Sequence, residues 1–564
     1  MDAQTETKVK DAPAAASARS GAFAPLREPV FRRLWIASVM ANFGQLILGV
    51  GAAWEMTRLS TSPGMVALVQ TAVMLPVVFV SLPAGAMADM FDRRRIAMIG
   101  LGLATVFASI LTVIAFLGMT TPWLLLTFCA LIGSGAALYY PAWQASIGEQ
   151  VSADKLPAAI ALGTISFNVA RSFGPAVGGL IVLAMGAKAA FGINAVFYLP
   201  LILTFYLWKR THLPSRLPPE RIDRAIMAGM RYARHSVPVR AVVGRALAFG
   251  LASAATYGLM PLVAKDLLAG NAGVYGVLLG SLGVGAVIGA LFVSQLRARF
   301  STETVVKLCS LCTALALPVI GFSRWMPLTC AAIAVNGACN ILVFAMLNVS
   351  VQLSAPRWVT ARALSLYSSA LSLGLGFGSW VWGEVAGFTD VTSAFVISGV
   401  AVILTLGLGG ILRLPGNGRE EDTAIAPLAN EPELNMDLTL RSGPVVIEIE
   451  YDVDPDRARE FHAVMTRMED MRRRIGGFDW SISRDIANPA LWIERYHCPT
   501  WGDYLRMRDR YTQADIAVQA LATSFDRHGD GQRVRRFLER PYGSVRWKAE
   551  SPDPKVETVG YLTP

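Results

Sequence analysis

The sequence predicts an all-α membrane protein with twelve transmembrane helices in two six-helix bundles, followed by a small soluble α+β domain. Three observations support this prediction. Hydrophobic residues make up 53% of the chain and charged residues only 16%, a composition unusual for a soluble globular protein. Twelve apolar runs lie between residues 34 and 412, and each has the length of about 20 residues that a helix needs to cross a bilayer. After residue 414 the composition becomes polar.

The predicted helices form two sets of six, separated by a long basic segment. The first set is 34–56, 64–88, 96–118, 123–146, 157–184 and 191–208. The second set is 241–264, 272–296, 304–322, 326–352, 360–386 and 391–413. We therefore expect an N-terminal bundle at 31–208, a basic cytosolic linker at 209–240 and a C-terminal bundle at 241–413. Residues 1–30, rich in Ala, Ser and Lys, are predicted to be a disordered cytosolic tail.

Basic residues gather in the loops on one side of the predicted bundles. That side carries Arg93, Arg94, Arg95, Arg297, Arg299, Lys307, Arg357, Arg362 and the basic linker, and the other side carries Arg58, Lys188, Lys265 and Arg324. Loops rich in Lys and Arg stay in the cytosol. We therefore expect a multi-pass protein of the bacterial cytoplasmic (inner) membrane with both termini cytosolic. This topology also explains much of the net charge of +10, so no nucleic-acid partner is expected.

The C-terminal region predicts a flexible linker at 414–442, a soluble domain at 443–545 and a tail at 546–564. Alternating apolar residues predict a strand at 445–453, and helical periodicity follows at 454–474 with Asp454 as the cap. The remaining predicted elements are strands at 478–485, 491–498 and 533–539 and a helix at 500–527. This β-α-β-β-α-β order is the ferredoxin-like arrangement.

The loop after the second predicted helix reads G-A-M-A-D-M-F-D-R-R-R and resembles the major facilitator loop signature G-x-L-A-D-R-x-G-R-K/R. The matching residues are Gly85, Ala88, Asp89, Arg93 and Arg94, and the departures are Met87, Met90 and Asp92. An acidic side chain at this position can favour the positive N-terminal end of a neighbouring helix and pair with Arg. We expect Gly85, Asp89, Arg93 and Arg94 to form a latch on the cytosolic side. The alternative is that the arginines only set the orientation.

The fifth predicted helix contains A-R-S-F-G-P-A-V-G-G, which resembles the signature g-x-x-x-G-P-x-x-G-G of exporters in the same superfamily. The matching residues are Gly174, Pro175, Gly178 and Gly179. Pro175 removes one helical hydrogen bond and bends the segment, and the glycines let a neighbouring helix approach closely. The resemblance implies a pivot or seal between the two bundles, as in antiporters. The alternative is ordinary packing of small residues.

Similarity extends along almost the whole chain beyond residue 30. It includes W-E-M-T-R-L-S-T-S-P-G before the loop, G-V-L-L-G-S-L-G-V-G in the eighth helix, and E-Y-D-V-D-P and W-G-D-Y-L-R-M-R-D in the soluble domain. These segments resemble the enterobactin-exporter, or transmembrane-secretion-effector, branch of the superfamily. The resemblance implies proton-coupled export, by alternating access, of a small amphiphilic or acidic compound such as a siderophore, secondary metabolite or drug. The fourth helix lacks the embedded Arg of many drug/proton antiporters, which leaves the coupling ion open.

Polar side chains at membrane depth are candidates for the transport path, because burying them in lipid is costly. Arg171, near the middle of the fifth helix, is the leading candidate, and Asn168 lies one turn away. The other candidates are Asn42, Gln45, Gln70, Asn336 and Asn340. For each amide an interhelical hydrogen bond is an equally good explanation. Glu55 and Glu384 lie near helix ends, where contact with water explains them.

No metal, cofactor or catalytic residue is expected. Cys309 and Cys312 lie in an apolar helix without other ligands. Aromatic residues of the soluble domain, with His462 and His497, suggest a monooxygenase pocket, but neither His has an acid or metal partner by spacing. We therefore expect a transporter. The alternatives are a transporter-derived sensor or scaffold that signals or self-associates through the C-terminal domain, and a membrane-tethered monooxygenase.

Overall fold

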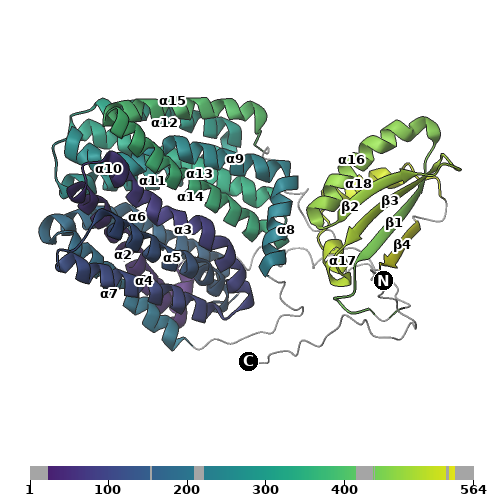
Figure 1. The fold of residues 1–564 in the computed structure, drawn as a ribbon, viewed down its shortest axis with the longest axis horizontal. Coiled ribbons are helices and arrows are strands. Elements are labelled where there is room, and N and C mark those ends of the chain that lie inside the picture. The colour runs from purple at the N-terminus through teal and green to yellow at the C-terminus, as the bar shows by residue number, and fades with distance from the viewer. Residues whose placement is uncertain are drawn as a thin grey trace, which may run out of the picture. The chain divides into compact units, whose positions relative to one another are not determined.

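The computed structural model describes residues 23–152, 155–208, 222–414, 436, 438–528 and 533–539. The chain divides into two compact units (Figure 1). The first comprises 1–225, 242–348 and 365–414, and the second comprises 226–241, 349–364 and 415–564. The second unit therefore contains short stretches of helix from the bundle region as well as the C-terminal domain.

The first half of the helical bundle consists of six long helices. They are α2 (Pro29–Leu59), α3 (Pro63–Met90), α4 (Arg93–Phe116), α5 (Pro122–Ser146), α6 (Leu156–Met185) and α7 (Ala187–Leu207). Proline begins α2, α3 and α5, where its missing N–H has no helical partner to lose. Residues 1–22 of the predicted tail lie outside the described residues. The remainder of that prediction is corrected, because Ala24–Arg27 form a 3-10 turn (η1) and α2 follows directly.

The second half of the bundle runs from α9 to α15. Its elements are α9 (Val237–Ser253), α10 (Ala255–Leu262), the π turn η3 (Val263–Leu267), α11 (Ala272–Arg299), α12 (Thr302–Phe322), α13 (Met326–Ser354), α14 (Arg357–Phe388) and α15 (Val391–Ile411). One predicted helix, 241–264, is divided into α9, α10 and η3. Helix α8 (Ile222–His235) lies in the segment predicted as a linker, of which 209–221 is outside the described residues.

Within the described residues, eleven helical segments are long and apolar enough to cross a membrane, with α9, α10 and η3 counted as one. The twelfth predicted span falls in α14, which has 32 residues but contains many Ser and Gly residues as well as Glu384. Its length still suffices to cross a bilayer at about 1.5 Å per residue. The predicted fold class of the membrane part is therefore confirmed.

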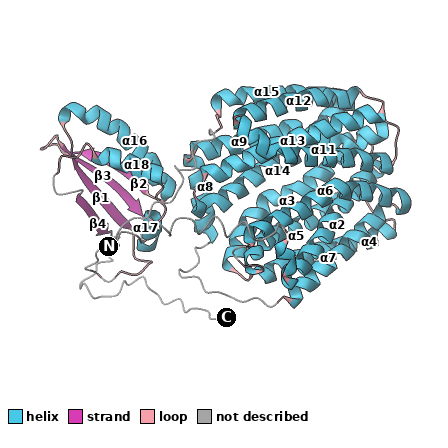
Figure 2. Cartoon of the chain, turned by 180° about the vertical axis from the view of Figure 1, so that it is seen from behind, coloured by secondary structure: helices cyan, strands magenta, loops and turns pink. Residues whose placement is uncertain are grey.

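The described strands all belong to the C-terminal domain (Figure 2). The order is β1 (Val445–Asp452), α16 (Ala458–Ile475), β2 (Phe478–Arg484), β3 (Leu491–Cys498), α17 (Trp501–Arg508), α18 (Gln513–Thr523) and β4 (Arg533–Leu538). The antiparallel sheet has the order β2-β3-β1-β4, as the ferredoxin-like arrangement requires. The 414–442 and 546–564 predictions lie mainly outside the described residues.

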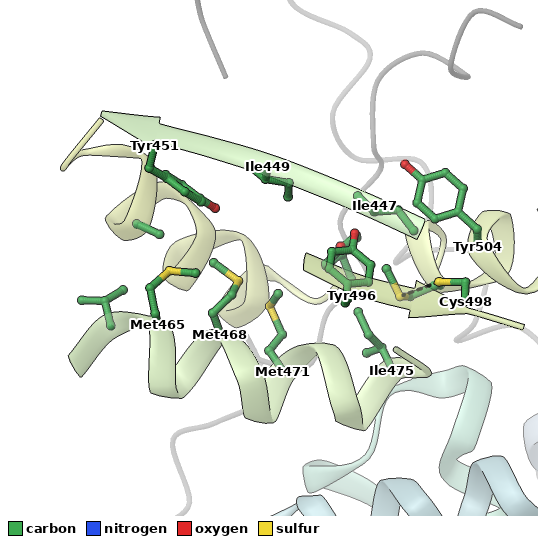
Figure 3. Packing of buried hydrophobic residues seen from close by; sticks show 14 of the residues in the cluster. Ile447, Ile449, Tyr451, Met465, Met468, Met471, Ile475, Tyr496, Cys498 and Tyr504 are labelled. Atoms are coloured by element: carbon green, nitrogen blue, oxygen red, sulfur yellow. Dashed lines mark hydrogen bonds between the residues drawn. The ribbon is translucent and has the colours of Figure 1, made fainter. Parts of the chain in front are cut away.

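Two details of this domain differ from the prediction. The helix expected at 500–527 is two helices, because Thr512 and Asp515 form a capping box that begins α18. Asp454 caps the 3-10 turn Pro455–Arg457 that precedes α16. The core lies between α16 and one face of the sheet, where Met465, Met468 and Met471 pack with apolar residues of β1 (Figure 3).

Candidate transport path

Helix α6 packs against a helix of its own half on one side and a helix of the other half on another. A Cβ at Gly174 would lie 3.1 Å from Leu46 of α2, and one at Gly178 would lie 3.2 Å from Ile47. On the other side, a Cβ at Gly179 would lie 2.6 Å from the Cα of Gly276 in α11. The glycines of the fifth-helix motif therefore bring both neighbouring backbones close to α6.

Arg171 lies halfway along α6, about 21 Å from each end of the helix. It precedes Gly174 and Gly178, which pack on α2, by three and seven residues, and it precedes Gly179, which packs on α11, by eight. Residues at these spacings share one side of a helix, so Arg171 belongs between the two contacts and away from exposed Phe173. The side chain is half-buried, and within the described residues no carboxylate pairs with it.

The two candidate amides of α2 make hydrogen bonds between helices of the first half. Asn42 donates its Nδ2 to the hydroxyl of Ser166, at 3.2 Å, and Gln45 accepts from the hydroxyl of Tyr198. Asn168, one turn before Arg171, is half-buried on α6. Each of the two bonds joins α2 to another helix of the first half. They agree with the explanation that Asn42 and Gln45 serve as interhelical hydrogen-bonding groups. Gln70 is half-buried in α3, and the structure assigns it neither to a hydrogen bond between helices nor to the path.

The two candidate amides of α13 are buried inside the second half. Asn336 donates to the hydroxyl of Thr256 at 2.9 Å, and Asn340 donates to the Oδ1 of Asn336 at 2.7 Å. Asn336 has no exposed surface and Asn340 only 1%. Asn336 therefore joins α13 to α10, whereas the bond from Asn340 lies within α13.

The arginines of the α3–α4 loop and the start of α4 bind helix ends within the first half. Arg93 donates to the carbonyl of Ala145, at 2.7 Å, and to Glu149, at 2.9 Å. Arg94 donates to the carbonyl of Tyr206, at the end of α7. Asp92, a departure from the family signature, caps α4 through the N–H of Arg94. Gly85 and Asp89 lie in α3, but their side chains are outside what the structure describes, so the latch stays a prediction.

One ion pair near the start of α12 in the second half is not apparent from the sequence. Arg245 of α9 is 4% exposed, and its guanidinium pairs with Glu303 at the start of α12. Lys307 lies 3.5 Å from the same carboxylate. A single Arg inside the predicted 241–264 span was the signal that could have revealed it. The prediction 304–322 left Glu303 just outside its helix, so the pairing was not apparent.

The residues that suggested the monooxygenase alternative do not share one environment. Trp501 and Tyr504, two of the aromatic residues concerned, lie in the core, His462 is exposed, and the ring of His497 lies 5.5 Å from that of Phe478 at a tilt of 36°. Two buried charged residues of this domain, Arg472 and Glu494, form the centre of a polar network. The Nε of Arg472 lies 2.9 Å from Glu494 and its Nη1 donates to Tyr511. Burial raises the pKa of Tyr511 to about 12 and keeps its hydroxyl protonated.

In the second unit the C-terminal domain contacts α8 and the first turn of α14. The guanidinium of Arg510 lies 4.2 Å from the ring centre of Trp358, and that of Arg474 lies 6.0 Å from the ring centre of Tyr232. The two aromatic rings meet edge to face at 5.6 Å. Cation–π contacts of this kind favour a defined placement of the domain on these helix segments.

A family model described as transmembrane secretion effector matches residues 20–542, which include both halves of the bundle and the C-terminal domain. The chain belongs to this family. It is therefore a multi-pass membrane transporter of the major facilitator superfamily and not an enzyme. The predicted family and the predicted absence of enzyme activity are confirmed.

Two relatives of this transporter have assigned functions. The multidrug efflux pump Tap of Mycobacterium tuberculosis is 24% identical over 423 residues, which cover 71% of this chain and 96% of the pump. The staphyloferrin A transporter of Staphylococcus aureus is 22% identical over 261 residues, which cover 45% of this chain and 64% of that transporter. Both relatives move small molecules across a membrane.

Solved structures share the fold. An inward-facing bacterial homologue of the human lysosomal transporter Spinster gives a TM-score of 0.54 at 13% identity and covers 69% of this chain and 95% of that chain. The POT family transporter PepTSo gives a TM-score of 0.56 at 13% identity, with coverages of 68% and 97%. These likenesses agree with the two-bundle fold of the membrane part.

Proposed function

We propose that this transporter exports a small amphiphilic or acidic organic compound, such as a siderophore, secondary metabolite or drug, by proton antiport with alternating access. The relatives support this proposal, because one is a multidrug efflux pump and another carries staphyloferrin A. The basic loops favour the bacterial inner membrane with cytosolic termini. Alternating access requires the two halves to move against each other around a central site.

The proposed chemical class of the cargo rests on the position of Arg171. It lies at mid-depth on the side of α6 between the contacts with α2 and α11, and no carboxylate of the described residues neutralises it. A charge at this depth is costly unless it is paired or hydrated. A planar guanidinium can bind a carboxylate or catecholate through two hydrogen bonds. We infer that an acidic or strongly accepting group of the cargo binds Arg171.

Flux into inside-out vesicles would test this proposal. Vesicles containing the protein should accumulate an iron-free catecholate or carboxylate siderophore when a proton gradient, acidic inside, is imposed. Collapsing the gradient should stop accumulation, and the methyl ester or ether of the same compound should be a poor cargo. Equal uptake of the acid and its neutral derivative would contradict the assigned role of Arg171. Uptake that is unchanged without the gradient would contradict proton antiport.

A sensor function is the second candidate, and the contacts of the C-terminal domain favour it. Arg510 and Arg474 of that domain contact Trp358 and Tyr232. A movement of these helix segments would therefore change the contacts of the domain. A sensor would bind its compound without net movement. The flux experiment separates the two functions, because accumulation against a gradient requires transport.

A further inference from the structure

Two charged side chains of the second half lie against helix ends of the first half, at the end of the bundle where α2 ends and α3 begins. Lys265 of η3 donates its Nζ to the carbonyl oxygen of Thr57, at 2.6 Å, in the last turn of α2. Glu384 of α14 places its carboxylate so close to Gly64, in the first turn of α3, that a Cβ added at Gly64 would clash with it. These contacts join the two halves.

The signs of both charges match the helix ends that they meet. The start of α3 has no acidic residue in its first turn and no capping hydrogen bond from Ser62, so its free N–H groups carry uncompensated positive charge. The carboxylate of Glu384 supplies the missing negative charge. The last carbonyl groups of α2 are the negative end of that helix, and Lys265 supplies the cation.

The two halves also pack closely against each other around the two charges. A Cβ at Gly383 would lie 2.6 Å from the Cβ of Ala67, so α14 and α3 cross with almost no space between them. On the other side, Trp54 of α2 stacks on Tyr275 of α11 with ring centres 6.3 Å apart. Opening this end of the bundle would separate both aromatic and small-residue contacts together with the two charges.

We propose that Lys265 and Glu384 form a two-charge lock that holds this end of the transporter closed, Lys265 by its hydrogen bond to the last turn of α2 and Glu384 by its charge beside the first turn of α3. The proposal rests on alternating access as the transport mechanism. Contacts between the halves at this end are lost when the end opens. The whole free energy of these contacts therefore favours the closed state. In the orientation expected from the basic loops, the lock closes the outer side, opposite to the predicted Asp89 latch.

Labelling of a thiol beneath the lock tests this inference without any cargo. Met74 lies deeper in α3 than Gly64, against Gly376 of α14, so Met74→Cys should be reached from this end only when the lock opens. A membrane-impermeant thiol reagent is applied to right-side-out and to inside-out vesicles, and labelling of the native cysteines is subtracted. We expect Glu384→Gln or Lys265→Met to raise the labelling rate about tenfold from the lock side alone.

A third variant should disrupt the lock without removing either charge. Gly64→Ala adds a methyl group that would clash with the carboxylate, so it should displace Glu384 and give a similar rise while leaving both charges in the chain. The matched control is Glu55→Gln, because Glu55 is also near this end but pairs at 3.3 Å with Arg58 of its own helix. Labelling in this control should equal that of the parent.

Unchanged labelling in all three lock variants would overturn the proposal. An equal rise in Glu55→Gln, or a rise from both sides of the membrane, would also overturn it, because both results indicate general loosening of the bundle. The result is independent of the proposed export. A protein that moves no compound in flux experiments but shows the expected one-sided labelling would refute export and support the lock.

Discussion

Arg245 in the second half and Arg171 in the first half both interrupt apolar membrane helices, but their surroundings differ. Arg245 is 4% exposed and pairs with Glu303 of its own half. Arg171 is half-buried between contacts to α2 and α11, and within the described residues it has no carboxylate partner. An arginine neutralised inside one half moves with that half. The proposed contact with the cargo therefore applies to Arg171 and not to Arg245.

The largest effect is expected from Arg171→Gln, which removes the charge from the middle of α6. Binding of an acidic cargo should weaken on the order of 100-fold, because one member of a buried charge pair is lost. Arg171→Lys should lie between this variant and the parent, since it keeps the charge but not the planar donors. Binding and flux on purified, stably folded protein are the measurements. If the flux of Arg171→Gln equals that of the parent, Arg171 has a structural role, as Arg245 has.

For Arg245 the expected loss is in stability. Glu303→Gln leaves the guanidinium of Arg245 without its carboxylate and should lower the free energy of unfolding by about 3 kcal/mol. The double variant Arg245→Met, Glu303→Leu should recover most of that loss, because neither charge then remains. Unfolding in mixed detergent micelles, followed by tryptophan fluorescence, measures both. Normal stability with lost transport in Glu303→Gln would mean that this pair, too, belongs to the transport path.

The same contrast should hold for two glycines, one between the halves and one inside the second half. Gly179→Ala would press on Gly276 across the halves, and Gly285→Ala would press on the backbone of Ala334 within the second half. Overpacking costs about 1–3 kcal/mol in each case. Gly179→Ala should therefore reduce both stability and transport, whereas Gly285→Ala should reduce stability and leave the transport of the folded protein unchanged. The control Gly280→Ala, whose Cβ would lie 3.4 Å from Ala176, should change neither.

The smallest effect is expected from ending the chain after Leu414. Neither arginine has a described partner beyond that residue, and the C-terminal domain has its own core. The shortened bundle should insert in the membrane and retain the pairing of Arg245 with Glu303. Membrane fractionation and the unfolding measurement above check this outcome. Failure of the shortened chain to insert would show that the bundle depends on the C-terminal domain.

The sequence by itself determined the membrane fold, the family and the strand order of the C-terminal domain. Apolar runs of about 20 residues predict helices that span a membrane. Alternation of apolar residues distinguishes the strand at 445–453 from the helix after it. These signals are local, so they need no knowledge of which helices meet. The capping box at Thr512 was equally local, but it was not recognised, and α17 and α18 were predicted as one helix.

The tertiary structure alone decided which polar residues are neutralised and by which partner. Asn336 and Thr256 are 80 positions apart in the chain, and Lys265 and Thr57 are 208 apart. Such pairs depend on helix rotation and on the close crossings that glycines permit, neither of which is encoded within one hydrophobic run. The sequence therefore identified Glu384 only as a residue near a helix end. Its place against Gly64 follows from the approach of α14 to α3.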